Sequence, residues 1–430
     1  MVETTQRCRV ALTITFAVLV LAPGLLEGGV LGASLPSGVI PSLWRVAREY
    51  GTIATVPSTS GSLGSVSANI VVGDSPYGMA YDSSTHRLYV ANSNDVNLSV
   101  IDTNTNVVTG SVQDLGDGNW AGPTGVAYDS ANGQVYVTVP TAGNRYSTGA
   151  VVAVVDTNNN SVIGWIHLPA ARDIVYDGNT GDLYVDSDLQ DGLQGIEIIS
   201  GGNDSVVGFI PVHGGAGPMA LDPGNHDLYV TTAFNSLLVV SDTTNSVIGN
   251  ITVGLEPYGV VAVPSLGRVF VANVGSTNLT VISTLTNTVS ATIPGVGSFG
   301  GLAYDSRNGA VYVADSLDGR VTGVDGTTGA VLGTIQDAVG GPWALLYDTD
   351  NGNMYVSNPG SNTISVITEV APPSSSGLLG LPNPWGTVVL ATVAAAAGLG
   401  VMLAYRRRSR GKASRVEPKS SDSRHGRGVM

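Results

Sequence analysis

Two polar segments, each set between apolar strand-like runs, hold the side chains best suited to bind a ligand. They contain Arg145 and Tyr146 in residues 138–150, and Asp186, Asp188 and Asp191 in residues 186–195. Carboxylates two and three positions apart supply the oxygen ligands that Ca²⁺ prefers. The segment departs from an EF-hand loop, because Asp191 stands where that loop requires Gly. We predict a ligand site here, with the three aspartates as a candidate Ca²⁺ site; the alternative is a solvated acidic loop.

His213 is the histidine whose setting best suits catalysis. It begins the Gly-rich segment His213–Pro218, which we expect at one mouth of the central channel of the fold. A general base needs a partner within hydrogen-bond reach. No two histidines of the exported part stand at the spacing of a pair of metal ligands. A lyase or lactonase that uses His213 is therefore an alternative function, and the many turn carboxylates offer no unique partner for it.

Composition excludes several kinds of chemistry. The single cysteine, Cys8, allows no disulfide framework and no Cys-based metal site. Residues 34–405 contain no lysine, and the chain has no phosphate-binding loop or nucleotide fingerprint, so we predict no nucleic-acid partner and no cofactor apart from the candidate Ca²⁺. The formal charge of −14 combines −21 for residues 34–405 with +7 for residues 406–430. An acidic body of this kind suits cationic partners.

The elements that must position these residues are short strands that recur along the chain. An aromatic residue followed by Val marks each repeat, at spacings of 41 to 48 residues. The marked pairs are Tyr89-Val90, Tyr136-Val137, Tyr184-Val185, Tyr229-Val230, Phe270-Val271, Tyr312-Val313 and Tyr355-Val356. A period in the forties, with four apolar strands per unit and Gly, Asn and Asp turns, is typical of β-propeller blades. Aspartates that end first and third strands, such as Asp82 and Asp102, are interpreted as turn-forming residues.

The strand inventory predicts how the ring closes. The seventh unit has three strands and then runs into a Pro/Ser/Gly-rich segment, so its fourth strand is missing. A surplus strand, Val66–Val72, precedes the first full unit. We predict that this N-terminal strand completes the last blade, because closure removes the open sheet edges of a linear array. The predicted fold is all-β: a seven-bladed β-propeller over residues 66–370.

The blade sequences resemble those of the YVTN-type β-propeller repeat family. The matching motifs are Tyr89-Val90-Ala91-Asn92, Phe270-Val271-Ala272-Asn273 and Tyr355-Val356-Ser357-Asn358, with preceding elements such as Pro76-Tyr77-Gly78 and Pro257-Tyr258-Gly259. Two units depart from the pattern, since Asp186 replaces a small residue in blade three and Val263-Pro264 replaces Tyr-Asp in blade five. The resemblance implies a secreted or cell-surface scaffold of archaea or bacteria, and it implies no single activity.

The two ends of the chain predict export and membrane anchoring. Residues 1–33 have the charged start and short apolar core of a signal peptide, and residues 34–65 form a linker. Residues 371–384 form a second linker, and residues 385–405 are an uncharged stretch long enough for a transmembrane helix. The basic tail, residues 406–430, marks the cytoplasmic side. We therefore expect a single-pass cell-membrane protein with an extracytoplasmic propeller.

Three functions remain open at this point. The first is a membrane-anchored surface scaffold whose propeller binds a protein or glycan partner, and the second is the exported enzyme named above. The third is a structural, surface-layer-like component. Because ligand sites on a rigid scaffold lie where the repetition is broken, a complete, ungapped set of acidic or aromatic residues lining one channel mouth would favour binding or catalysis. A mouth of Ser, Thr and Gly would favour the structural component.

Overall fold

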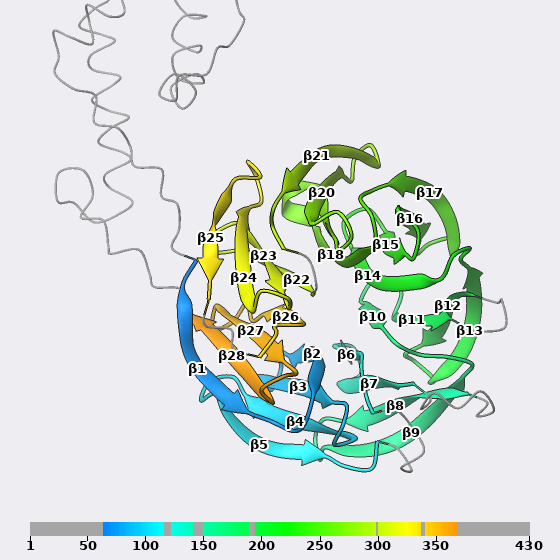
Figure 1. The fold of residues 1–430 in the computed structure, drawn as a ribbon. Helices are drawn as coiled ribbons and strands as arrows, with labels where there is room; N and C mark the ends of the chain where they lie inside the picture. The colour runs from blue at the N-terminus through cyan, green and yellow to red at the C-terminus, as the bar shows by residue number, and fades with distance from the viewer. Residues whose placement is uncertain are drawn as a thin grey trace, which may run out of the picture. The chain divides into compact units, whose positions relative to one another are not determined.

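Seven four-stranded antiparallel sheets surround a central axis in the computed structural model (Figure 1). The structure describes residues 63–115, 122–140, 149–188, 194–297, 300–336 and 340–368, and at Asp188 the backbone alone. In six sheets the strands follow chain order from the axis outward, and the seventh takes its outermost strand from the start of the propeller. The prediction of an all-β seven-bladed propeller is confirmed.

Blades one to four follow one another along the chain. Blade one comprises β2 (Pro76–Asp82), β3 (Arg87–Asn92), β4 (Asn97–Asp102) and β5 (Val107–Val112). Blade two comprises β6 (Val126–Asp129), β7 (Gln134–Val139), β8 (Ala150–Asp156) and β9 (Ser161–Leu168). Blade three comprises β10 (Ile174–Asp177), β11 (Asp182–Asp188), β12 (Gln194–Ser200) and β13 (Ser205–Pro211). Blade four comprises β14 (Ala216–Asp222), β15 (Asp227–Thr232), β16 (Ser236–Ser241) and β17 (Ser246–Thr252).

Blades five to seven complete the ring. Blade five comprises β18 (Pro257–Val263), β19 (Arg268–Asn273), β20 (Asn278–Ser283) and β21 (Thr288–Pro294), with the 3-10 helix η1 (Pro264–Leu266) in its first turn. Blade six comprises β22 (Leu302–Asp305), β23 (Ala310–Asp315), β24 (Arg320–Asp325) and β25 (Val331–Ile335). Blade seven comprises β26 (Leu345–Tyr347), β27 (Asn353–Asn358), β28 (Thr363–Thr368) and β1 (Ser65–Val71).

The predicted closure by an N-terminal strand is confirmed, with bounds one residue earlier than expected. Strand β1 pairs antiparallel with β28, from Ser65 opposite Thr368 to Val71 opposite Thr363. A second contact supports the seam, because the Tyr312 hydroxyl of blade six donates a hydrogen bond of 3.0 Å to the backbone carbonyl of Leu63. The first and last parts of the propeller chain are therefore held together in one sheet.

Buried tyrosines on the second strands tie five of the seven blades to the next one in the same way. The Tyr hydroxyl donates to a side-chain oxygen in the turn between the third and fourth strands of the following blade. The pairs are Tyr89–Asn160 (3.1 Å), Tyr136–Asp204 (2.6 Å), Tyr184–Asn245 (3.0 Å), Tyr229–Asn287 (3.0 Å) and Tyr355–Asn106 (2.8 Å). Each acceptor residue has φ between 49° and 55°, a region in which Asn and Asp are enriched. Where blade five carries Phe270, the following turn carries Gly329, so donor and acceptor are replaced together.

Close approach between blades explains the Gly that follows Tyr77 in blade one and Tyr258 in blade five. The Gly78 amide donates to the Thr124 carbonyl of the next blade at 2.9 Å, and a Cβ on Gly78 would lie 2.2 Å from that oxygen. A Cβ on Gly259 would lie 2.5 Å from the Gly300 carbonyl oxygen. The absence of a side chain thus lets neighbouring first strands meet around the axis.

The predicted signal peptide, linkers, transmembrane helix and basic tail lie outside the described residues. Among the residues that the structure does describe, no helix is long and apolar enough to span a bilayer. The predictions of export and anchoring therefore stay predictions.

Candidate functional site

All seven blades start at the same face of the propeller, which we call the mouth face. It also carries the connections between second and third strands, while the opposite turn face carries the turns between first and second strands and between third and fourth strands. One position per blade, at the start of the first strand, differs widely in residue type. Around the ring its occupants are Tyr77, Thr124, Arg172, Gly217, Tyr258, Gly300 and Trp343.

Three of these side chains form an aromatic cluster, which we call the aromatic mouth: Tyr77, Tyr258 and Trp343. The ring centroids of Tyr77 and Trp343 are 5.3 Å apart with an interplanar angle of 82°. The rings of Tyr258 and Trp343 are 5.6 Å apart at 73°. Since Tyr258 belongs to blade five and Trp343 to blade seven, the cluster spans blade six, which has Gly300 at the variable position. All three rings are partly exposed.

Blade three adds charged side chains to the described part of the mouth. Arg172 occupies the variable position, and Asp173 follows it where other blades have mostly Gly. Asp186 lies on β11, at a position that holds Ala, Thr or Ser in the other blades. The backbones of these residues are paired, because the Arg172 amide donates to the Asp186 carbonyl (3.3 Å) and the Asp186 amide donates to the Asp173 carbonyl (3.0 Å). Arg172 is exposed, whereas Asp186 is 2% exposed.

Burial raises the pKa values of two groups at this site. Burial raises the pKa of Asp173 to about 6, even though the backbone amides of Met219 and Ile174 donate to its carboxylate. The Met219 contact measures 3.0 Å and links blade three to blade four. Burial also raises the pKa of Tyr258 to about 12, with further increases from the charges of Asp173, Tyr77 and Asp186 and an opposing effect of Arg172. These groups are therefore close enough to act on one another.

Neighbouring hydroxyls hold the backbone of the charged pair. The side chains of Thr124 and Thr138 each donate to the Arg172 carbonyl at 2.8 Å. The Thr138 hydroxyl also accepts the Gly125 amide at 2.7 Å. Blades two and three are therefore locked together beside Arg172, which fixes where its side chain leaves the backbone.

The structure describes some of the residues predicted as ligand contacts and leaves others undescribed. Asp186 is buried at the mouth face beside Arg172, and the backbone of Asp188 ends β11 on the same face. Arg145, Tyr146 and Asp191 lie outside the described residues. Among the described residues no group of three His, Cys, Asp or Glu side chains is arranged to hold a metal ion. The Ca²⁺ site, which needs Asp191, stays a prediction.

His213 lies on the mouth face, between β13 and β14, and its side chain is exposed. Next to it, Gly214 has φ 98° and packs against the ring of Phe234, so that a Cβ there would lie 2.5 Å from that ring. No hydrogen bond of the described residues joins His213 to a carboxylate that would orient it as a base.

The repeated aspartates have the structural role that their positions predicted. Asp82 accepts the amide and hydroxyl of Ser84, and Asp129 accepts the Ala131 amide at 2.8 Å. Asp177, Asp222, Asp305 and Asp348 accept the amide two residues later in the same way. These carboxylates hold the turns of the turn face and do not converge on a site.

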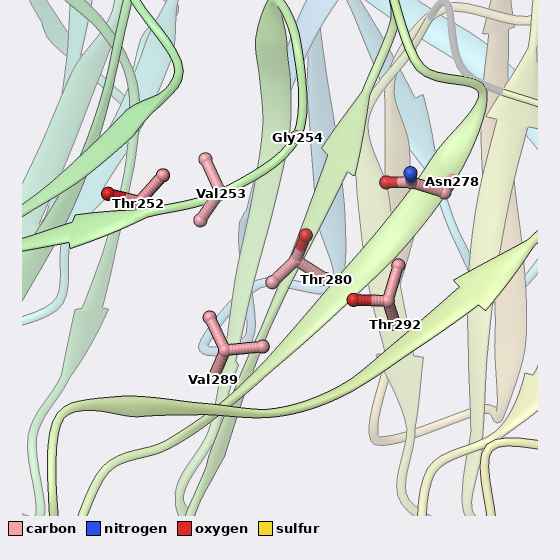
Figure 2. A pocket seen from close by; sticks show the side chains of 7 residues that line it. All are labelled: Thr252, Val253, Gly254, Asn278, Thr280, Val289 and Thr292. Atoms are coloured by element: carbon pink, nitrogen blue, oxygen red, sulfur yellow. The ribbon is translucent and has the colours of Figure 1, made fainter.

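Two hollows share no lining residue with the aromatic mouth. The first, of about 180 Å³, is lined by Thr252, Val253, Gly254, Asn278, Thr280, Val289 and Thr292 between blades four and five. Figure 2 shows Val253 and Val289 on one side of it and Asn278 and Thr292 on the other. The second, of about 240 Å³, contains Arg320 paired with Asp315 (3.0 Å) and Asp318 (2.8 Å). One hollow lacks charged side chains and the other has its charges paired, so the aromatic mouth remains the stronger candidate.

The three aromatic residues of the mouth were not predicted from the sequence as site residues. A signal for them was present, because each follows a Pro: Pro76-Tyr77, Pro257-Tyr258 and Pro342-Trp343. The residue after this Pro is the variable one, and its variation identifies the face on which the repetition is broken.

The fold and this mouth define the class of protein as a closed seven-bladed β-propeller with an aromatic and charged channel mouth. No protein-family model matches the sequence, and no curated protein matches it either. Among solved structures it is similar to Kuenenia stuttgartiensis hydrazine synthase, with 19% identity and a TM-score of 0.59 over 70% of this chain and 97% of that one. It is also similar to the β-propeller domain of Myceliophteria thermophila Cps50 (Swd1), with 9% identity and a TM-score of 0.57 over 70% and 98%. Such low identities establish the shared fold alone.

Proposed function

We propose that this protein is a membrane-anchored, extracytoplasmic binding scaffold that engages its partner through the aromatic mouth. The observation that carries the proposal is the cluster of Tyr77, Tyr258 and Trp343 beside Arg172, Asp173 and Asp186. A structural coat subunit needs no such group at its channel mouth. Partly exposed aromatic rings with adjacent charges are a usual composition of recognition surfaces.

The topology of the propeller suits anchoring from the turn face. Strand β28 runs from the mouth face to the turn face, so the chain leaves the last blade at Thr368 on the turn face. Ser65, at the start of β1, lies opposite Thr368. If the segment after Thr368 leads to the predicted membrane helix, the aromatic mouth faces away from the bilayer.

The resemblance of the blades to YVTN-type repeats supports the same proposal, because that family is typical of secreted and cell-surface proteins. An enzyme of the lyase or lactonase type receives less support. Catalysis at His213 would require an oriented base, and its exposed side chain on the mouth face has no carboxylate in the described residues to orient it.

Two measurements on cells that produce the full chain with a cytoplasmic C-terminal tag test this proposal. In the first, external protease should remove the propeller and leave a membrane-protected fragment carrying the tag. In the second, a photo-crosslinking residue replaces Leu317 on the mouth face or Leu285 on the turn face; the two side chains are 76% and 91% exposed. We expect a surface adduct from position 317 and none from position 285. A protected propeller, or equal adducts from both faces, would contradict the proposal.

A further inference from the structure

We propose that the group bound by the aromatic mouth is an organic cation, such as a quaternary or alkylated ammonium. This inference rests on the proposed function and names the ligand chemistry of the same site. The ammonium group can belong to a free small molecule or be presented by a surface partner, and the chemistry that recognises it is the same.

The geometry of the three rings favours a cation. Tyr77 and Tyr258 each stand nearly perpendicular to Trp343, so the cluster presents differently oriented aromatic walls within one small region. A cation is attracted to an aromatic face when it lies within about 6 Å of the ring centroid, and Trp is the strongest partner. Centroid separations of 5.3 and 5.6 Å allow one ammonium group to contact more than one ring.

The charged side chains beside the rings also favour a cation. Asp173 and Asp186 stand at positions that hold small or uncharged residues in the other blades, and both act on the Tyr258 phenol. Among the described side chains of this blade-three group, Arg172 supplies one positive charge against the two carboxylates, so their sum is negative. The Asp173 carboxylate is held by the Met219 amide, which keeps it at the mouth.

The electrostatic field of the whole propeller favours a cation as well. Residues 34–405 carry 29 acidic residues and eight arginines, with no lysine. Such a field concentrates cations near the surface and repels anions. An anionic ligand would meet this field with Arg172 as its cationic contact among the described residues of the mouth, and a neutral sugar would gain nothing from the field.

A matched pair of probes tests the inference. Choline and 3,3-dimethylbutan-1-ol have nearly the same shape, and only choline carries a charge. Both are titrated into the full-length chain in a non-ionic detergent by calorimetry. We expect choline to bind about tenfold more tightly than the alcohol, because the cation–π attraction is lost with the charge. Equal affinities, or no saturable binding of choline, would overturn the inference.

Variants locate the binding at the mouth. Trp343→Leu keeps an apolar side chain without the indole face and should weaken choline binding about tenfold. Asp173→Asn, which keeps an acceptor for the Met219 amide, should weaken it several-fold. Trp165→Leu is the matched control, because Trp165 is 42% exposed on the outer strand β9, away from the axis, and should leave binding unchanged. Unchanged affinity in both mouth variants would refute the assignment.

The adduct experiment distinguishes this inference from the proposed function. If choline added to cells suppresses the adduct formed at position 317, the cation is presented by a surface partner. If choline binds the purified chain and no adduct forms, the inference holds for a free cation and the surface-partner proposal falls. If the adduct persists and choline does not bind, the ligand class is wrong and the proposed function stands.

Discussion

Asp173 belongs to the proposed ligand site, and its buried carboxylate also lowers the free energy of unfolding. In the folded chain its pKa is raised by burial from the ordinary 3.8 to about 6. Between these two pH values the folded state binds more protons than the unfolded state, so the free energy of unfolding falls as pH rises. Above pH 6 the cost of the buried charge is fully present.

We therefore predict that Asp173→Asn stabilises the propeller at pH 7 by on the order of 1–3 kcal/mol. The same substitution should remove the decrease of stability between about pH 4 and 6 that this group causes in the parent protein. Urea denaturation of both proteins across this pH range measures the difference. A parallel pH dependence in parent and variant would show that the native carboxyl titrates at its ordinary value.

The tyrosine hydroxyls of the second strands offer another test at the scale of single residues. Tyr184→Phe removes the donor that lies 3.0 Å from the Asn245 side-chain oxygen at the seam between blades three and four. We predict a loss of about 1 kcal/mol in the free energy of unfolding, since a partly buried acceptor loses its partner. Denaturant midpoints check this value.

The natural control for that substitution is blade five. Phe270 has no hydroxyl to donate, and Gly329 of the next turn has no side-chain oxygen to accept. Donor and acceptor of the pair are therefore both missing at this seam. Replacing Phe270 by Tyr alone should therefore yield no gain comparable to the loss at Tyr184. A clear stabilisation by Phe270→Tyr would show that the hydroxyl finds an acceptor other than the expected turn residue.

At the scale of the element, the closest contacts between blades occur where the first strands begin. Gly78→Ala places a methyl group 2.2 Å from the Thr124 carbonyl oxygen, which is backbone and cannot rotate away. We predict a destabilisation of about 1–3 kcal/mol, typical of overpacking. Gly110→Ala is the matched control, because its Cβ would meet only the Asn160 side chain at 3.6 Å. Equal thermal shifts in the two variants would contradict the steric explanation.

The elements were predictable from sequence because each blade repeats the same signals. Apolar runs of four to seven residues, turn aspartates and the aromatic-Val pairs gave seven blades and the closing strand, since these features determine local structure and burial. The aromatic mouth was not predicted, because Tyr77, Tyr258 and Trp343 lie far apart in the sequence and meet only when the ring closes. The sequence prediction placed the site in the long polar segments instead, and of the residues named there Asp186 lies at the mouth.

At the scale of the whole molecule, closure makes the aromatic mouth depend on the N-terminal strand. Trp343 belongs to blade seven and Tyr77 to blade one, and β1 pairs with β28 in the same sheet that carries β26. The Leu63 carbonyl and Ile70, which is 7% exposed, add a hydrogen bond from blade six and an apolar contact with blade one. Stability and ligand binding should therefore be coupled at this seam.

Deleting residues 63–71 should lower the melting temperature of the entire propeller and broaden its transition, because a ring with an open edge no longer unfolds as one unit. Scanning calorimetry of the full chain with and without the deletion measures both effects. Substituting Ile70→Ala, a milder change at the same seam, should cost about 2–4 kcal/mol and keep a single transition. If the deletion leaves the melting temperature unchanged, the closing strand does not hold the ring together, and the position of Trp343 beside Tyr77 must depend on the first strands alone.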